Sequence, residues 1–409
     1  MFVEEQRFEN KVRSVRKGIC TSDNFRYTRL FWEINSNTIG SSINESVNGK
    51  YWTGFIISED SQRYFYDPIQ RINWKNDGIE VKGMQEQAHG NYSKRINSES
   101  SYFRSGLSWS FRTARFEPHI IPYGSMCSSN RFLADFCNDN ESILYTCALW
   151  NSEYMDYCIK LSLEAVSGNP CYNNGTVNQL PFPEVSISLK QRLIQVTIEQ
   201  YNRIRHTFNI RETSLYFCSN EFVKYNSLAE CCHSLEVKHN LLSNLYLDTQ
   251  AELNRLIYSH FNLTHDEIQR IKSSNSRLTS SEEAKIFKIS DDIIIRNILS
   301  FLIGCIFNRW DIRIISQWKN EWSNEDLFKA RSHSPFLFGQ KESTLQLVLP
   351  DYQKEVVQIW KQPYPIMCLK ENATSKDIVS KLKEVIAFFW PNTASVSYTH
   401  LTLPTSDLV

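Results

Sequence analysis

The stretch between residues 63 and 78 places positively charged side chains among aromatic rings. Its cations and rings belong to Arg63, Arg71, Lys75, Tyr64, Phe65, Tyr66 and Trp74. Cations neutralise phosphate groups and aromatic rings stack on bases, so this combination suits contact with a distorted duplex or with the neighbours of an extruded nucleotide. A β-hairpin with core aromatics on one face and solvated charges on the other fits the same residues. Both interpretations stay open at the level of sequence.

Further arginines and amides in the first half of the chain extend this pattern. Arg104, Arg112 and Arg115 could reach phosphates or base edges, and guanine is the preferred target of a bidentate arginine. Lone arginines also coat ordinary protein surfaces. The candidates for phosphate or base contact are Lys17, Arg26, Arg29, Arg63, Arg71, Asn73, Lys75, Asn76, Arg104, Arg112 and Arg115.

The chain as a whole carries no net charge. Its 409 residues include 45 basic and 45 acidic side chains, and 41% are hydrophobic, which is typical of a soluble globular protein and not of a disordered one. Basic residues nevertheless outnumber acidic ones in residues 7–29 and 94–131. Such patches could give salt-dependent phosphate binding, or they could belong to a solvated mixed surface.

The eleven cysteines form no Cys-x-x-Cys pair, and Cys231 and Cys232 lie beside His233 and His239 without zinc-finger spacing. We therefore expect free thiols in a reducing cytosol and no metal site. No charged-then-apolar leader opens the sequence, which argues against secretion. The most apolar run, residues 293–307, is too short to span a bilayer, so we expect a cytoplasmic chain without a membrane partner.

Hydrophobic periodicity predicts an α+β fold in which a mixed, β-rich lobe precedes a mainly α-helical domain. We expect a turn that accepts positive φ at Asn76-Asp-Gly78, a capping box at Thr264 and Glu267, and core positions for Trp74 and Trp109. Strands are expected over residues 51–57, 71–74 and 106–111, and helices over residues 143–161, 189–208, 248–263, 291–310 and 375–389.

Composition shifts divide the chain into successive regions. The predicted regions are a mixed α/β lobe over residues 1–185, a helical scaffold over 186–312 and a truncated C-terminal α/β extension over 313–396. Residues 397–409 continue no preceding pattern and resemble translated sequencing-adapter read-through. We expect them to be a non-native tail.

No catalytic constellation is present in the sequence. None of the 13 glycines forms a Gly-x-Gly loop, and Gly-x-Ser-x-Gly, Walker and His-Glu-x-x-His patterns do not occur. The nine histidines form no ligand-spaced pair. The sequence therefore predicts no catalytic, cofactor-binding or metal-binding residue in this chain.

Seven segments carry a resemblance to one enzyme family, and the resemblance spans most of residues 17–390. Lys17-Gly-Ile-Cys-Thr-Ser-Asp-Asn-Phe-Arg-Tyr-Thr-Arg29 is similar to the block that opens the recognition region of PglX-type adenine-specific DNA methyltransferases of BREX phage-defence systems, although Ser22 stands where the family has glycine. That serine puts the tight backbone turn in doubt. The other similar segments are 64–78, 102–110, Leu149-Trp-Asn-Ser152, Val177-Asn-Gln-Leu-Pro-Phe-Pro183, Ala251-Glu-Leu-Asn-Arg-Leu-Ile257 and 291–312, the last being specific to the PglX branch.

The resemblance implies that residues 1–185 form a target-recognition lobe and that the chain is the DNA-reading fragment of a site-specific methyltransferase. The missing catalytic domain would bind S-adenosylmethionine, and this chain would bind no cofactor. The implied partners are double-stranded DNA and other phage-defence proteins. The alternatives are the specificity region of a related type IIG restriction enzyme, a non-catalytic DNA-binding component of a defence complex, and a helical scaffold that binds no DNA.

One tetrapeptide imitates the family's Asn-Pro-Pro-Tyr catalytic motif. In Asn169-Pro-Cys-Tyr172, the asparagine could accept an adenine amino group and the tyrosine could stack on its ring. Asn169-Pro170 also starts a turn in a loop that contains Gly168 and Gly175. Neither a preceding buried strand nor an upstream cofactor loop is present, so we favour the turn.

Overall fold

The computed structural model describes residues 7–11, 15–57, 62–113, 115–163, 170–274, 283–307, 309–310, 326–329, 331 and 378–390. The chain divides into two compact units and crosses between them several times. Unit 1 consists of Met1–Arg205, Asn244–Ile286 and Glu325–Ser332, and unit 2 of His206–Ser243, Phe287–Asn324 and His333–Val409. The predicted domain boundaries at residues 185 and 312 stay a prediction, and most of the predicted extension and the whole of the predicted tail lie outside the described residues.

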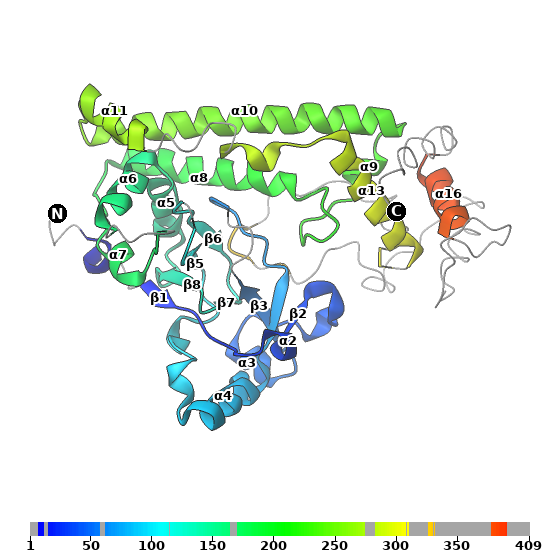
Figure 1. Ribbon diagram of the computed structural model, residues 1–409, viewed down its shortest axis with the longest axis horizontal. Helices are drawn as coiled ribbons and strands as arrows, with labels where there is room; N and C mark the ends of the chain where they lie inside the picture. Colours follow the sequence, from blue (N-terminus) through cyan, green and yellow to red (C-terminus); the bar gives the residue numbers. More distant parts are fainter. Residues whose placement is uncertain are drawn as a thin grey trace. The chain divides into compact units, whose positions relative to one another are not determined.

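Unit 1 contains two four-stranded sheets (Figure 1). The first has the strand order β1-β8-β5-β6 and is antiparallel throughout. Its two central strands are buried along their whole length, including the charged residues Arg131 and Asp135. These strands are β1 (Val15–Lys17), β5 (Gly106–Ser110), β6 (His119–Ile121) and β8 (Arg131–Asp135).

The second sheet has the order β2-β4-β3-β7, with β3 and β7 parallel and the other pairs antiparallel. Its strands are β2 (Thr28–Leu30), β3 (Trp52–Ile56), β4 (Gln70–Asn73) and β7 (Ser125–Cys127). The predicted strands at 51–57, 71–74 and 106–111 are confirmed. Trp74 and Trp109 are fully buried, as predicted.

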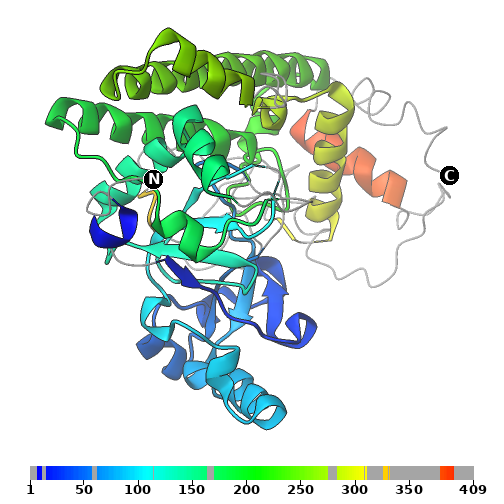
Figure 2. The same cartoon turned by 60° about the vertical axis from the view of Figure 1, so that its left-hand side comes forward.

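The turn at Asn76-Asp-Gly78 has positive φ at all three residues, as expected, but it does not lead into another strand. It leads into α4 (Lys75–His89), whose regular right-handed turns follow Gly78. Figures 1 and 2 both show α4 at the opposite end of unit 1 from α8 and α11. The other helical segments in the described part of residues 1–139 are short. They are α1 (Phe8–Lys11), α2 (Asn24–Tyr27), α3 (Ile43–Val47) and 3-10 turns at Phe31–Glu33, Ser36–Thr38, Tyr92–Lys94 and Glu99–Ser101.

The helix predicted over residues 143–161 is two helices, α5 (Asn140–Trp150) and α6 (Glu153–Ser162). The break falls at Asn151 and Ser152 because the Ser152 hydroxyl accepts the Met155 N–H, which starts a new helix. The Asn151 side chain meanwhile donates to the carbonyl oxygens of Cys147 and Pro118. Periodicity continued across the break and hid it.

The later helices follow the predictions with one large extension. The helices are α7 (Asn174–Asn178), α8 (Ile187–Thr207), α9 (Asn220–Val223), α10 (Leu228–His260), α11 (His265–Ser274), a 3-10 turn at Lys285–Phe287, α13 (Asp291–Ile306) and α16 (Ile378–Phe389). α10 is 33 residues long and begins well before the predicted residue 248. The capping box is confirmed, because the Glu267 carboxylate accepts the Thr264 N–H at 2.8 Å. The α+β prediction is confirmed as well.

Unit 2 has a core in which aromatic rings from distant segments meet. Phe217 lies 4.9 Å from Trp310 and 5.7 Å from Phe301, measured between ring centroids. At the end of α13 a buried carboxylate, Glu212, accepts from Trp310 Nε1 at 2.8 Å and from Arg309 at 2.6 Å. The block that resembled the PglX branch is thus held together around Glu212. In the parts of the chain that the structure describes, no helix is long and apolar enough to cross a lipid bilayer.

Candidate nucleic-acid interface

The segment from Lys17 to Arg29 contains a turn on unit 1 that packing and a hydrogen bond hold in place. Gly18 packs against the backbone carbonyls of Cys127 and Ser128, where a Cβ would collide. Ser22 adopts φ +60°, so the left-handed turn persists although a serine occupies the position of the family's glycine. The Gln85 side chain donates to Thr21 O at 2.8 Å and fixes the turn to α4.

The cations of this turn differ in their exposure and in whether they have hydrogen-bond or ion-pair partners. Lys17 is exposed at the end of the edge strand β1. Arg26 is also exposed, but it forms an ion pair with Glu80 at 2.5 Å. Arg29 is half-buried and donates to the carbonyl oxygens of Phe25 and Thr28. Lys17 is therefore the cation of this turn most accessible to a phosphate.

A second cluster brings together the predicted residues Asn73, Lys75 and Asn76. The Lys75 ammonium lies 5.7 Å from the centroid of the Tyr51 ring, a cation–π distance. Trp52 lies opposite Asn73 in the ladder between β3 and β4. Lys75 and Asn76 are exposed, whereas Asn73, Tyr51 and Trp52 are half-buried. Positive charge, amides and accessible rings therefore share one end of the second sheet.

Sequence reasoning did not include Tyr51 and Trp52 in this cluster. Their alternation with Thr53 and Phe55 marked them only as strand residues. The strand pairing that places Trp52 opposite Asn73 and lets Trp74 N–H donate to Tyr51 O was the missing information. An antiparallel pairing of the two predicted strands would have supplied it.

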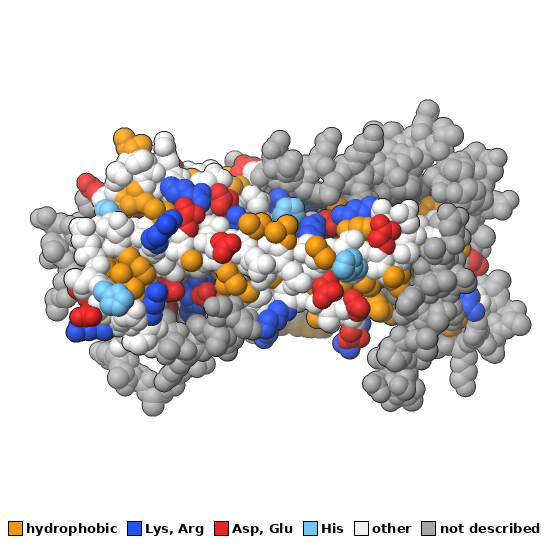
Figure 3. All heavy atoms as spheres, turned by 90° about the horizontal axis from the view of Figure 1, so that it is seen from above, with side chains coloured by type: hydrophobic (Ala, Val, Ile, Leu, Met, Phe, Trp, Pro, Cys, Tyr) orange, Lys and Arg blue, Asp and Glu red, His pale blue; other side chains and the backbone are white. Residues whose placement is uncertain are grey.

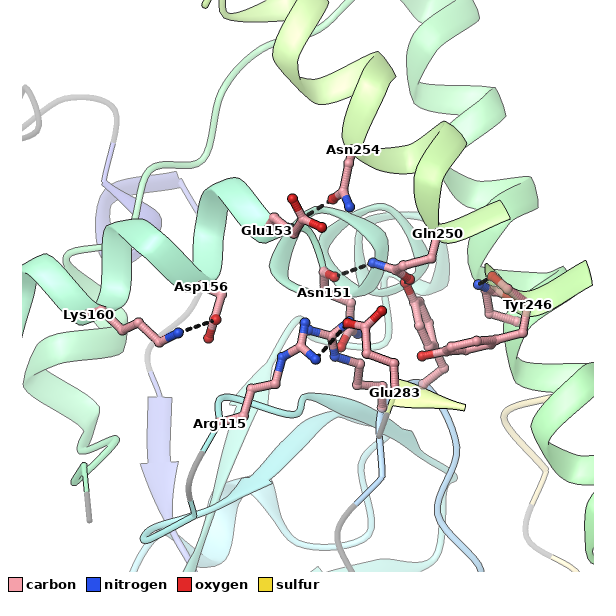
Figure 4. A network of polar contacts seen from close by, with 12 residues as sticks. Arg115, Asn151, Glu153, Asp156, Lys160, Tyr246, Gln250, Asn254 and Glu283 are labelled. Atoms are coloured by element: carbon pink, nitrogen blue, oxygen red, sulfur yellow. Dashed lines mark hydrogen bonds and ion pairs between the residues drawn. The ribbon is translucent and has the colours of Figure 1, made fainter. Parts of the chain in front are cut away.

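Three predicted DNA contacts, Arg63, Arg71 and Arg115, lie in the interior of unit 1. The Arg71 side chain is 1% exposed and donates to the carbonyl oxygens of Pro68, Gln70 and Arg331. Arg63 and Arg115 are buried and share the Glu283 carboxylate, at 3.4 and 2.7 Å. Figure 4 shows the contact between Arg115 and Glu283. These positions suit guanidinium groups that stabilise the fold, and we exclude the three residues from the interface proposed below.

The buried arginines sit beside two neutral tyrosines. Burial raises the pKa of Tyr64 well above its ordinary value and raises that of Tyr246 to about 12. Tyr64 donates through its hydroxyl to Gln250 Oε1 at 2.9 Å. The aromatic rings around residue 64 therefore belong to the core and do not form a stacking surface. This agrees with the core position that the hairpin interpretation gave to the aromatic residues.

Arg104 and Arg112, the remaining predicted arginines, are also engaged by neighbouring side chains. Arg104 forms an ion pair with Asp135 at 3.3 Å, and Arg112 donates to Cys171 Sγ. Tyr172, from the tetrapeptide that imitates a catalytic motif, is fully buried and lies 5.3 Å from the Phe116 ring. Its ring is thus not accessible to a base, while Asn169 lies outside the described residues.

Two further segments that resembled the family meet in Figure 4. Gln250 Nε2 donates to Asn151 O at 2.8 Å, and Asn254 Oδ1 accepts the Glu153 N–H at 2.9 Å. The first contact joins α10 to the end of α5, and the second joins it to the start of α6. An open hollow of about 710 Å³ lies alongside them and is lined in part by Glu153, Asn254 and Tyr258.

The described residues offer no counterpart of an S-adenosylmethionine loop. The glycines with positive φ are Gly49, Gly78, Gly90 and Gly124, which are isolated from one another in the sequence and lie in separate turns. A methyl-donor loop needs closely spaced glycines after a strand. We therefore assign no cofactor residue, and no group of metal-ligating side chains occurs in the described ranges.

The face that carries α10 shows basic and acidic side chains interspersed with apolar ones (Figure 3). Arg192 of α8 pairs with Glu252 of α10 at 2.5 Å and with Glu199 at 2.9 Å. Such mutual neutralisation gives no field of one sign to attract phosphates. The turn at residues 17–29 and the cluster around Lys75 are the better candidates for a nucleic-acid interface.

Comparison with known proteins gives one informative similarity. No protein-family model matches the chain. The sequence is 23% identical over 310 residues to the adenine-specific methyltransferase PglX of Lacticaseibacillus casei (strain Zhang). The alignment covers 73% of this chain but 24% of that protein. The chain is therefore related in sequence to a methyltransferase and spans about a quarter of its length.

Proposed function

We propose that this chain is the DNA-recognition portion of a site-specific adenine methyltransferase that uses S-adenosylmethionine and acts in cytoplasmic phage defence. The observation that carries the proposal is the alignment of most of this chain to a quarter of PglX, combined with a sequence that lacks both the glycine loop and the Asn-Pro-Pro-Tyr motif. The catalytic part would lie on other residues. This chain would supply register on the duplex and choice of sequence.

The geometry supports a division of labour between the two accessible clusters. Lys17 and Lys75 are exposed cations that could neutralise phosphates and so set affinity and salt dependence. The exposed amide of Asn76 and the half-buried rings of Tyr51 and Trp52 lie beside Lys75, where base edges and sugars would come within reach. The buried arginines would hold this surface in shape.

Fluorescence anisotropy with a labelled random-sequence duplex tests the proposal. The wild-type chain should bind at low salt, and the logarithm of its association constant should fall linearly with the logarithm of the salt concentration. Lys17→Ala and Lys75→Ala should each weaken binding and reduce the slope by about one. Lys272→Ala, an exposed lysine on α11 at the opposite end of unit 1, is the matched control and should change neither quantity.

Absence of binding at low salt would overturn the proposal and favour a helical scaffold. Binding in which the lysine variants match the control would overturn the interface. The coding sequence beside this chain provides a separate test. We expect a domain with an Asn-Pro-Pro-Tyr motif there. An additional nuclease domain with a PD-x-x-E/D-x-K motif would identify a type IIG enzyme. A neighbouring sequence that encodes no catalytic domain would favour a free-standing DNA-binding protein.

A further inference from the structure

Asn76 lies in a backbone conformation that side-chain-bearing residues rarely adopt. Its φ and ψ are 49° and 52°, and Asp77 and Gly78 continue in the same left-handed region. Asparagine tolerates this region better than most residues, but three consecutive left-handed residues persist only where their surroundings hold them. Strain of this kind is common at binding sites.

Every neighbour of Asn76 is anchored. Trp74 N–H donates to Tyr51 O at 2.8 Å, and Lys75 N–H donates to Asn73 Oδ1 at 3.2 Å. On the other side, the Asp77 carboxylate accepts from Trp74 Nε1 at 3.1 Å and pairs with the Lys82 ammonium at 2.7 Å. A Cβ on Gly78 would lie 2.7 Å from the Trp74 ring, so the glycine closes the turn against the core. The backbone of Asn76 is therefore fixed from both directions.

The Asn76 side chain, by contrast, forms no hydrogen bond with any of the described residues. It is also exposed. Asn73 uses its carbonyl oxygen on Lys75, and Asp77 is engaged by Trp74 and Lys82. A rigid backbone thus presents one free amide beside the exposed ammonium of Lys75.

We infer that Asn76 reads the major-groove edge of an adenine in the target sequence, an inference that rests on the proposed function. A carboxamide carries a donor and an acceptor side by side, which matches N7 and the N6 amino group of adenine. Guanine offers two acceptors at this edge and would leave the amide oxygen without a partner. Lys75, one residue earlier, would bind the adjoining phosphate and hold the amide at the groove.

Selection of bound duplexes from a random-sequence pool tests the inference. The wild-type chain should enrich a motif that contains one or more adenines. Asn76→Gly keeps the left-handed turn without strain, so the melting temperature and the salt slope should stay unchanged while one adenine position loses roughly tenfold or more of its discrimination. Asn76→Asp should shift that position towards cytosine, whose amino group a carboxylate accepts.

Asn138→Gly is the matched control, because Asn138 is also an exposed asparagine with positive φ, at 66°. It should leave the enriched motif unchanged. A wild-type chain that binds no duplex, or that binds without sequence preference, would overturn the proposed function itself. A wild-type motif that Asn76→Gly leaves intact, or binding that falls equally for all sequences, would overturn only the assignment of Asn76.

Discussion

The side chain of Gln250 on α10 donates a hydrogen bond to the backbone carbonyl oxygen of Asn151, 2.8 Å away, where α5 ends. Its other amide atom accepts from the hydroxyl of Tyr64 at 2.9 Å. One buried amide thus joins three segments of unit 1 that lie far apart in the sequence.

We expect Gln250→Leu to destabilise unit 1 by about 2–4 kcal/mol, because a carbonyl oxygen and a hydroxyl would both lose their partner in the interior. Hydrogen-exchange protection of α5 and α6 should fall accordingly. Gln269→Leu, an exposed glutamine on α11, is the control and should leave protection unchanged. Equal protection in the two variants would contradict the structural role of Gln250.

Glu283 neutralises two buried guanidinium groups, so its loss should be costly. Glu283→Gln should destabilise unit 1 by about 3–5 kcal/mol, because Arg63 and Arg115 would remain charged without a counter-ion. Glu86→Gln on the exposed face of α4 serves as the control. Adding Arg115→Leu to Glu283→Gln should restore part of the unfolding free energy measured by urea denaturation, and failure to do so would argue against charge as the cause.

Gly304 marks a close approach at the end of α13. A Cβ at this position would lie 2.5 Å from the Trp310 ring and 2.7 Å from Glu212 Oε1. Gly304→Ala should therefore destabilise unit 2 by about 1–3 kcal/mol through overpacking, read as lower hydrogen-exchange protection of α13. Gly83→Ala is the opposite case, since its Cβ would meet nothing within 4 Å inside α4, and it should stabilise that helix by about 0.5–1 kcal/mol.

Glu221 gives unit 2 an acid-sensitive contact. Burial alone would raise its pKa, but Lys238 and Lys224, at 2.7 and 3.0 Å, outweigh burial and lower it to about 2. Because the folded pKa lies below the ordinary value of 4.5, the stabilisation is complete above pH 4.5 and is lost as the pH falls towards 2. The loss should be on the order of 3 kcal/mol.

Unfolding free energy measured between pH 6 and pH 2, about the range over which this carboxyl titrates, would show the effect. Glu221→Gln should flatten the pH dependence and lower the stability near neutral pH. Glu236→Gln, an exposed glutamate on α10, should retain the wild-type profile. A Glu221→Gln profile parallel to that of the wild type would exclude this carboxylate as the source.

Local signals in the sequence predicted much of the fold. The alternation in residues 51–57, the Asn76-Asp-Gly78 turn and the Thr264–Glu267 box each depend on neighbours within a few positions, and all three are confirmed. The break at Asn151 and Ser152 was missed because hydrophobic periodicity continues across it, and the contact between Asn151 and Gln250 joins residues 99 positions apart. Register across such distances is not encoded in periodicity.

The candidate interface was harder to predict because charged side chains were assumed to be exposed to solvent. Arg63 and Arg115 are buried only because Glu283, 220 and 168 positions further on, returns to meet them. Tyr51 and Trp52 joined the cluster through strand pairing and not through their own sequence context. Whether the accessible residues contact DNA stays a prediction.

Residues 228–243 of α10 belong to unit 2 and residues 244–260 to unit 1. One continuous helix therefore contributes residues to both units. Because the chain also passes between the units at other points, a single recombination event could not transfer either unit as one contiguous stretch of sequence. Under the proposed function, new target preferences would arise more readily from point substitutions on exposed turns, such as the one that carries Asn76.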